Sequence, residues 1–490
     1  MEKITLNLSV KEKIGYSLGD TASHFVWDMV GFWLLFFYTD VYGISAAAAG
    51  TIMLVARFWD AGIDPVIGIL SDRTNTRWGK FRPYILFGAI PYAVIAVLAF
   101  STPHLGETGK IVYAVATYVL LMTAYASVNL PFSALGAVMT DDTYERAGLN
   151  TYRFIAGFTG QFIVSGLALT LVSFLGKGNQ AQGFQYTVML FAGLSLVFFF
   201  ITFQTTKERV KPPKAQQNSI KEDFGNLFKN KAWVILAIVG IVSFVMFAMQ
   251  NAAIAYYFKY YLGSEGNEPF SKAWTLLKEG QLLDKIKTLN SEGNLYNTFQ
   301  HLLNDVQLFN ILGTIALIVA LPLSKPLAKR FGNKNVFIAS SLISGLFFML
   351  IYLPGVTDLT TIYVFNIIAK MAYAPAVPLL WTMIADSADY GEWTTGRRAT
   401  GLYFSAAVFA QKAGWGIGAA IAGWILAASG FVANIVQNDT AITGIKLLVS
   451  VIPGILYMSC AIFMIFYKID AKTTTLMKQE LDARRAKENE

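Results

Sequence analysis

Long apolar runs dominate this sequence and restrict its fold more than any other feature. A helix needs about 20 mainly apolar residues to cross the hydrocarbon core of a bilayer. Twelve runs of about that size follow one another along the 490 residues, several of them interrupted by Gly, Pro or a polar residue. They lie near residues 15–39, 46–70, 84–102, 111–139, 151–175, 186–205, 233–262, 306–324, 335–353, 360–385, 400–430 and 443–467. The sequence therefore predicts an all-α membrane protein with twelve transmembrane helices.

The composition agrees with a membrane location and argues against binding to nucleic acid. Charged residues make up 14% of the chain and hydrophobic residues 55%, whereas a soluble protein carries about 25% charged residues. The net charge of +8 comes from Lys and Arg that cluster at the ends of the apolar runs, where the positive-inside bias places them. The single cysteine, Cys460, excludes an intramolecular disulfide and a cysteine-based metal cluster.

A polar segment divides the twelve runs into two sets of six. Residues 207–231 are rich in Lys and contain a Pro-Pro pair, and we interpret them as a cytoplasmic linker. The predicted domains are an N-terminal half at 1–206 and a C-terminal half at 232–467, followed by a cytoplasmic tail at 468–490. Short motifs after corresponding helices echo each other weakly between the halves, and internal repeats of this kind are typical of transporters.

Basic and nearly uncharged loops alternate along the chain. The loops at 71–83 and 325–334 are rich in Lys and Arg, as are the linker and the tail, whereas the alternate short loops contain only Lys110 and Lys177. The positive-inside rule places the basic loops and both termini in the cytoplasm. We therefore expect a multi-pass protein of the plasma membrane, the inner membrane in a bacterium.

A polar insertion at 263–304 separates the seventh and eighth runs on the predicted outer side. Its Leu and Ile residues recur at helical spacing, which indicates one or two amphipathic helices. The insertion is either a passive cap over the external mouth or a functional element, namely a lid or a site where a partner docks, and the sequence leaves these interpretations open.

The second apolar run carries three charged residues, Arg57, Asp60 and Asp64. The two aspartates are one helical turn apart and share a face. A charge in the hydrocarbon costs from about 2.5 to more than 10 kcal/mol, so such residues usually have a function. A bound cation or a shared proton relieves the repulsion between two ionised carboxylates. We interpret the pair as a cation site, with a structural ion pair to Arg57 or Lys412 as the alternative.

Three motifs together resemble those of the glycoside-pentoside-hexuronide:cation symporters, a family of the major facilitator superfamily whose best-known member is the sodium/melibiose permease. The motifs are Trp-Asp-Ala-Gly-Ile-Asp-Pro at 59–65, Arg-Trp-Gly-Lys-Phe-Arg-Pro at 77–83 and Asp-Ser-Ala-Asp-Tyr-Gly-Glu-Trp at 386–393. The resemblance covers nearly the whole chain except 263–304. It implies a major facilitator fold and the uptake of a sugar derivative together with a cation.

The resemblance also implies roles for individual residues. Asp60 and Asp64 match the paired carboxylates of the family's cation site, and Lys412 matches a lysine near that site. Arg153 matches an arginine of the sugar site, and Tyr125 matches a tyrosine near it.

The sequence departs from the melibiose permease at several positions of these sites. Ser23 and His24 replace a Lys-Asp pair, and Ala126 replaces a threonine that helps to bind sodium. Asn129 replaces an aspartate that faces the sugar, and Ser133 replaces a tryptophan. These differences indicate a rebuilt sugar pocket and leave Na⁺ and H⁺ both open as the coupling ion.

Polar and aromatic residues of the first, fourth and fifth runs are further candidates for sugar contacts. Arg153 can donate two parallel hydrogen bonds to hydroxyls or to a carboxylate, or it is an interfacial arginine close to the cytoplasm. His24 lies one turn before Asp28 and is either a ligand or a packing residue. The predicted substrate-binding residues are Arg153, Asn129, Tyr125, His24, Trp27 and Asp28.

Charged loops on the cytoplasmic side can form ion pairs that break as the halves rock, or their charges only set the topology. The predicted gating residues are Arg77, Lys80, Arg82, Asp386, Asp389 and Glu392.

We therefore expect a cation-coupled symporter that imports a glycoside, pentoside or hexuronide by alternating access. A lysophospholipid symporter of the same fold and a sugar sensor that does not transport are the alternatives. The sequence has no Cys/His metal cluster and no Gly-rich phosphate loop, so we expect no catalytic residues, no metal and no cofactor. The expected partners are the sugar and membrane lipids. The oligomeric state stays open, and a monomer is compatible with the sequence.

Overall fold

The computed structural model describes residues 8–140, 143–209, 220–263, 305–396 and 400–469, together with positions between 473 and 483. Regular secondary structure in these residues is helical, apart from one isolated bridge between Thr76 and Gly79. This agrees with the predicted helical class. Nearly all of the predicted insertion, residues 264–304, and the middle of the predicted linker, residues 210–219, lie outside the described residues.

The chain divides into two compact units, and the division does not follow a single cut in the sequence. Unit 1 consists of Met1–Lys214, Phe258–Ile311 and Leu426–Asn438. Unit 2 consists of Ala215–Tyr257, Leu312–Ile425 and Asp439–Glu490. The division into halves at 1–206 and 232–467 stays a prediction.

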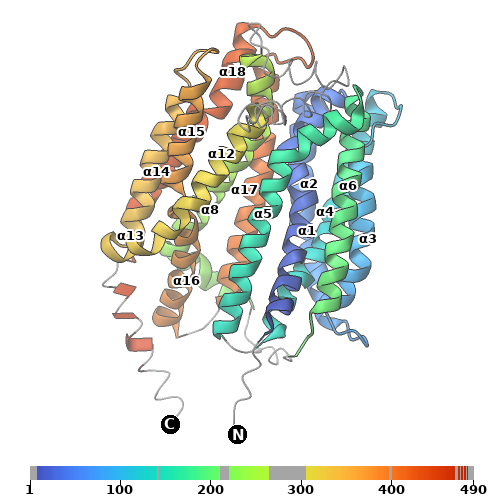
Figure 1. Ribbon diagram of the computed structural model, residues 1–490. Coiled ribbons are helices and arrows are strands. Elements are labelled where there is room, and N and C mark those ends of the chain that lie inside the picture. Colours follow the sequence, from blue (N-terminus) through green and yellow to red (C-terminus); the bar gives the residue numbers. More distant parts are fainter. Residues whose placement is uncertain are drawn as a thin grey trace, which may run out of the picture. The chain divides into compact units, whose positions relative to one another are not determined.

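Unit 1 is built on six long helices. They are α1 (Val10–Phe36), α2 (Ala46–Arg73), α3 (Arg82–Ala99), α4 (Glu107–Met139), α5 (Thr143–Gly176) and α6 (Gln180–Thr205), and η1 (Phe37–Val41) continues α1. Helix α1 begins at a capping box, in which Ser9 and Glu12 satisfy each other's backbone N–H groups. It packs against α5 and α6, while α3 packs against α4 and α6, and α2 packs against α4 (Figure 1).

Unit 2 contains most of the other helices that the structure describes. They are α7 (Ile220–Lys229), α8 (Lys231–Tyr256), α13 (Ser324–Phe331), α14 (Asn333–Leu350), α15 (Leu359–Tyr373), α16 (Ala376–Thr395), α17 (Thr400–Ala428), α18 (Asp439–Val449) and α19 (Val451–Ile465). Helix α14 packs against α15 and α19, and α8 packs against α16, α18 and α19. Apolar side chains such as Leu236, Phe337, Leu380 and Met464 form its buried core. Three elements have residues in both units: η2 (Tyr257–Leu262), α12 (Asp305–Ala320) and α17, which enters unit 1 at Leu426. A short 3₁₀ helix, η3 (Leu321–Leu323), joins α12 to α13.

Nine segments among the described residues are long and apolar enough to cross a membrane. They coincide with nine of the twelve predicted runs, and the other three runs fall on the long helices α1, α2 and α17. Acidic, basic and histidine side chains inside α1 and α2 lower the mean hydropathy of those helices. The total of twelve transmembrane helices stays a prediction.

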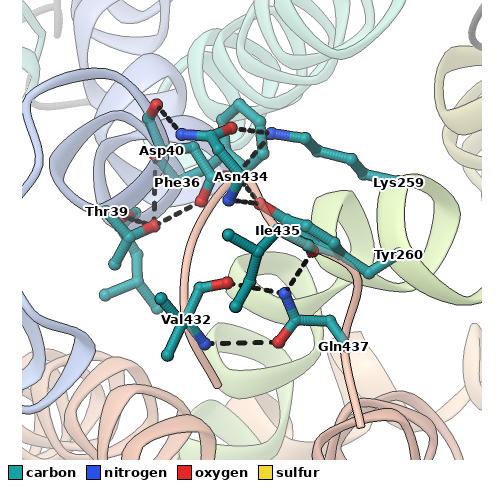
Figure 2. A network of polar contacts seen from close by, with 10 residues as sticks. Phe36, Thr39, Asp40, Lys259, Tyr260, Val432, Asn434, Ile435 and Gln437 are labelled. Carbon is teal, nitrogen blue, oxygen red and sulfur yellow. Dashed lines mark hydrogen bonds and ion pairs between the residues drawn. The ribbon is translucent and has the colours of Figure 1, made fainter.

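A polar network joins three chain segments of unit 1 (Figure 2). Lys259 Nζ of η2 lies 2.5 Å from Asp40 Oδ1 of η1 and 2.7 Å from Asn434 Oδ1. The Tyr260 hydroxyl donates to the Asp40 carboxylate, and Asn434 Nδ2 donates to the Asp40 carbonyl at 2.8 Å. Asn434 has a φ of 62°, a left-handed conformation that asparagine accepts more readily than most residues. One acidic residue after α1 therefore ties η2 and the segment 426–438 together.

Candidate functional site

Three titratable residues follow one another at successive turns of α1: Asp20, His24 and Asp28. His24 Nδ1 lies 2.9 Å from Asp28 Oδ2. Arg153 of α5 donates from Nε to Asp20 Oδ1 at 2.9 Å and from Nη2 to Ser133 Oγ of α4 at 3.4 Å. The structure thus places Arg153 and His24 at the contact between α1 and α5, with Asp28 one turn further along α1.

Two glycines of α5 allow this close approach. A Cβ atom at Gly157 would lie 2.7 Å from Asp20 Oδ2 and 3.0 Å from His24 Nε2. A Cβ atom at Gly160 would lie 2.9 Å from the Cβ of His24. Any larger residue would push these side chains away from α5, so the small residues of α5 fix the position of the ion pairs on α1.

An aromatic stack joins α1 to α4. The Trp27 ring of α1 stacks on the Tyr125 ring of α4, with ring centroids 4.5 Å apart and an interplanar angle of 23°. The Arg57 guanidinium of α2 lies 4.6 Å from the Trp27 ring centroid, a distance at which a cation and an aromatic face attract each other. Asn129 of α4 donates from Nδ2 to Ser23 Oγ of α1 at 3.4 Å. The remaining predicted substrate residues therefore meet where α1, α2 and α4 come together.

The predicted cation pair lies on α2. Asp60 is fully buried, and its Oδ2 is 3.8 Å from Arg57 Nη1. Asp64, one turn further along, is partly buried. Arg57 therefore contacts both the acidic residue of the cation pair and the Trp27 ring. The ion pair that the sequence offered as an alternative is present, and a buried carboxylate close to one cation can still exchange that partner for a coupling ion.

Lys412, the other basic residue that the sequence places near the cation site, lies on α17 in unit 2 and is partly exposed. Its role beside Asp60 and Asp64 stays a prediction.

The basic loop between α2 and α3 binds a carboxylate of its own unit. The backbone N–H groups of Lys80, Phe81 and Arg82 donate to the Glu208 carboxylate at 2.8, 2.8 and 3.1 Å. The Arg82 guanidinium donates to the Phe203 carbonyl at 2.6 Å, close to the end of α6. These bonds fasten the loop to the chain that leaves α6.

Gly79 is required at the tight approach of this loop to Glu208. Gly79 has a φ of 108°, and a Cβ atom there would lie 2.4 Å from Glu208 Oε1. The Arg77 guanidinium lies 4.3 Å from the Trp78 ring centroid. The acidic gating candidates Asp386, Asp389 and Glu392 lie on α16 in unit 2. Ion pairs between the basic and the acidic group stay a prediction.

Asp20 and Glu208 are functional candidates that the sequence prediction lacks. Asp20 precedes His24 by the same four residues that separate His24 from Asp28, so helical periodicity along α1 was the available signal. No comparable pattern marks Glu208, because its partners are backbone groups more than 100 residues earlier in the chain.

Long apolar helices that carry charged residues in their interior are typical of a polytopic membrane transporter. The chain matches the family described as MFS/sugar transport protein over residues 15–274 and 297–471. It therefore belongs to that family, and the resemblance to the glycoside-pentoside-hexuronide:cation symporters is confirmed.

Curated relatives and a solved structure agree with this assignment. The putative glycoside/cation symporter YagG of Escherichia coli (strain K12) is 36% identical, over 98% of this chain and 96% of the relative. The inner membrane symporter YicJ of the same organism is 34% identical, over 93% of this chain and 91% of the relative. The crystal structure of the nucleoside transporter NupG is 15% identical, with a TM-score of 0.60 over 93% of this chain and 100% of that structure. The NupG likeness supports a fold shared with membrane transporters.

Proposed function

We propose that this chain is a cation-coupled symporter that imports a glycoside, pentoside or hexuronide by alternating access. The observation that carries the proposal is the fully buried Asp60 carboxylate, which is joined through Arg57 to the Trp27–Tyr125 stack. The name of the relative YagG, a putative glycoside/cation symporter, supports the same function. The relatives do not favour a lysophospholipid symporter or a sensor that does not transport.

The proposed architecture has twelve transmembrane helices in two halves, with both termini in the cytoplasm. The nine candidate spans among the described residues and the basic character of alternate loops support it. The protein would lie in the plasma membrane, the inner membrane in a bacterium, as the name of the relative YicJ indicates for that protein.

In the proposed mechanism, a cation or a proton binds at Asp60 and Asp64. A cation bound to the Asp60 carboxylate, or a proton on it, weakens the attraction between Asp60 and Arg57. Arg57 is then free to move on the Trp27 face. Because Trp27 stacks on Tyr125, that movement reshapes the neighbouring sugar site. The coupling requires that the cation binds more tightly to the state that binds sugar, since a ligand with equal affinity for both states shifts neither.

The proposed sugar site uses both kinds of contact that sugars favour. Trp27 offers an aromatic face, while Asn129 and Arg153 offer hydrogen-bond donors. Arg153 donates to Asp20 and Ser133, and its side chain, which has five N–H donors, is partly exposed. His24 and Asp28 add a polar pair on α1. Lys412 is proposed to act near the cation site, and the charged groups of loop 71–83 and α16 to control opening.

An uptake screen in proteoliposomes tests the proposed function. Purified protein is supplied with pentosides, glycosides and hexuronides, first with a sodium gradient and then with a proton gradient. We expect accumulation of at least one sugar class against its gradient with one of the two ions, and none in the Asp60→Asn variant. Uptake that only equilibrates, whichever ion gradient is applied, would contradict cation coupling.

A further inference from the structure

Lys370 is a basic residue of unit 2 that the proposed mechanism does not use. It lies in the last turn of α15, eleven residues after Leu359. Because a helix rises about 1.5 Å per residue, Lys370 is about 16 Å from the start of the candidate span Leu359–Thr395. Half the thickness of the hydrocarbon core is about 15 Å, so a bilayer crossed by this candidate span would have Lys370 near its middle.

The helix is interrupted immediately after Lys370. Helix α15 ends at Tyr373 and α16 begins at Ala376, so one candidate span is made of two helices with a break between them. Discontinuous helices near the midplane are a common feature of substrate sites in transporters. The break also directs the carbonyl end of α15 toward the neighbourhood of Lys370, where a positive charge is favourable.

The surroundings of the Lys370 ammonium are aromatic. Its Nζ lies 5.2 Å from the ring centroid of Phe247 and 5.7 Å from that of Phe348. Gly313 allows α12 to approach, because a Cβ atom there would lie 3.3 Å from Lys370 Cγ. Within the residues that the structure describes, the Lys370 side chain makes ring contacts but no hydrogen bond and no ion pair.

This arrangement differs from that of other basic residues inside the apolar helices. Arg153 lies 2.9 Å from Asp20, and Lys259 lies 2.5 Å from Asp40, so each has a carboxylate as its partner. A cation over aromatic rings recovers only part of the cost of a charge in the hydrocarbon. The side chain of Lys370 is only partly buried, so a ligand can reach it. A negatively charged group that arrives with the ligand would supply the missing partner.

An aromatic surface suited to a sugar lies beside Lys370. Phe247 packs edge-on against Trp415 of α17, with ring centroids 5.2 Å apart, and Trp415 is partly exposed. Lys370 and Trp415 thus have Phe247 as a common neighbour. A cation and an aromatic face in one neighbourhood suit a sugar acid, whereas a neutral sugar uses only the aromatic face.

We propose that Lys370 binds the carboxylate of an acidic sugar and makes the transporter selective for hexuronides over neutral glycosides. This inference rests on the proposed sugar transport and narrows its substrate class. An ammonium and a carboxylate form a charge-assisted hydrogen bond, which is stronger than a bond between neutral groups. The Lys370 side chain needs no bidentate geometry for this contact, because its ammonium acts as a point charge with three rotatable donors.

The test uses two substrates that differ only at C6 of the sugar. The compound 4-nitrophenyl β-D-glucuronide carries a carboxylate there, and 4-nitrophenyl β-D-glucoside carries a hydroxymethyl group. Uptake of each is measured in proteoliposomes for the wild-type chain and for the variants Lys370→Met and Lys370→Arg. Lys446→Met is the matched control, because Lys446 also lies over an aromatic ring of unit 2, 4.4 Å from the centroid of Tyr352.

We expect the wild-type chain to prefer the glucuronide. Lys370→Met should lower that preference about tenfold or more, the effect of losing one hydrogen bond to a charged group, while the KM for the glucoside stays nearly unchanged. Lys370→Arg should keep the preference, and Lys446→Met should not alter it.

The outcomes separate this inference from the proposed function. A wild-type chain that takes up the glucoside without preferring the glucuronide would contradict the role of Lys370 and leave sugar transport intact. If Lys370→Met lowers the uptake of both substrates equally, Lys370 does not determine selectivity, because a lysine with a purely structural role gives that pattern. Failure of the wild-type chain to take up either compound or any sugar of the screen would contradict the proposed function itself.

Discussion

Arg153 Nε on α5 donates a hydrogen bond to Asp20 Oδ1 on α1 across 2.9 Å. This bond orients the guanidinium while the Phe132 ring, 5.2 Å away, supports one face of it. The Arg153 side chain is partly exposed, so a ligand can approach its guanidinium. Asp20 is therefore a positioning residue for Arg153 in the proposed sugar site.

The first prediction concerns Arg153. Arg153→Lys keeps the charge beside Asp20 but loses the planar fork that binds two hydroxyls at once. We expect the KM for sugar to rise about tenfold, which corresponds to about 1.4 kcal/mol, while the cation concentration that gives half-maximal uptake changes little. Arg153→Ala should weaken sugar binding further. Both constants can be measured by uptake in proteoliposomes, and a larger effect on the cation than on the sugar would contradict the assignment.

Periodicity made part of this site predictable. Asp60, Asp64 and Arg57 are close in the sequence, and a charge inside an apolar run is evident without a structure. The fold class and the long helices could be predicted as well, because each apolar run is long enough to cross a bilayer. The pairing of Arg153 with Asp20 could not be predicted, because 133 residues separate them. Helical spacing predicts only which residues of a single helix lie on the same face.

The network around Asp40 shows the same limit more strongly. Asp40 contacts Lys259, which is 219 residues away, and Asn434, which is 394 residues away. A motif search has no signal for such contacts, since each residue is ordinary in its own segment. Only the packing of η1, η2 and the segment 426–438 brings the three together.

The second prediction concerns coupling. Asp60→Asn removes the negative charge of a fully buried side chain with little change of shape. We expect concentrative uptake to disappear, because the amide neither binds a proton nor attracts a cation as a carboxylate does. Exchange of labelled for unlabelled sugar should persist and can be measured by counterflow in the same vesicles. Normal accumulation in this variant would contradict the coupling role of Asp60.

The third prediction tests the close approach of α1 and α5. In Gly157→Ala the new Cβ would lie 2.7 Å from Asp20 Oδ2, so the two helices or the Asp20 side chain must move. We expect a loss of stability of about 1 to 3 kcal/mol, typical of overpacking, together with a higher KM for sugar. The control is Gly193→Ala on α6, where a Cβ would meet nothing within 4 Å. Thermal unfolding of the purified variants measures the difference, and equal melting temperatures for both would argue against this contact.

The last prediction concerns the ion pair between Lys259 and Asp40. The Asp40 side chain is 0% exposed. Among the described residues, Lys259→Met leaves this buried carboxylate with the hydroxyl groups of Thr39 and Tyr260 as its donors. Removing one partner of a buried pair costs about 3 kcal/mol or more, whereas removing both costs less. We therefore expect Lys259→Met to lower the melting temperature more than the double variant Asp40→Asn/Lys259→Met does.

A nearby lysine provides the control for this pair. Lys110 Nζ donates to the Tyr42 carbonyl at 2.8 Å and lies 5.4 Å from the centroid of the Tyr42 ring. Lys110→Met removes a lysine of the same unit without leaving a carboxylate alone, so it should lower the melting temperature only slightly. A double-mutant cycle on Asp40 and Lys259 then isolates their coupling from general effects of lost charge. If the losses in the two single variants simply add in the double variant, the contact does not hold η2 to the end of α1.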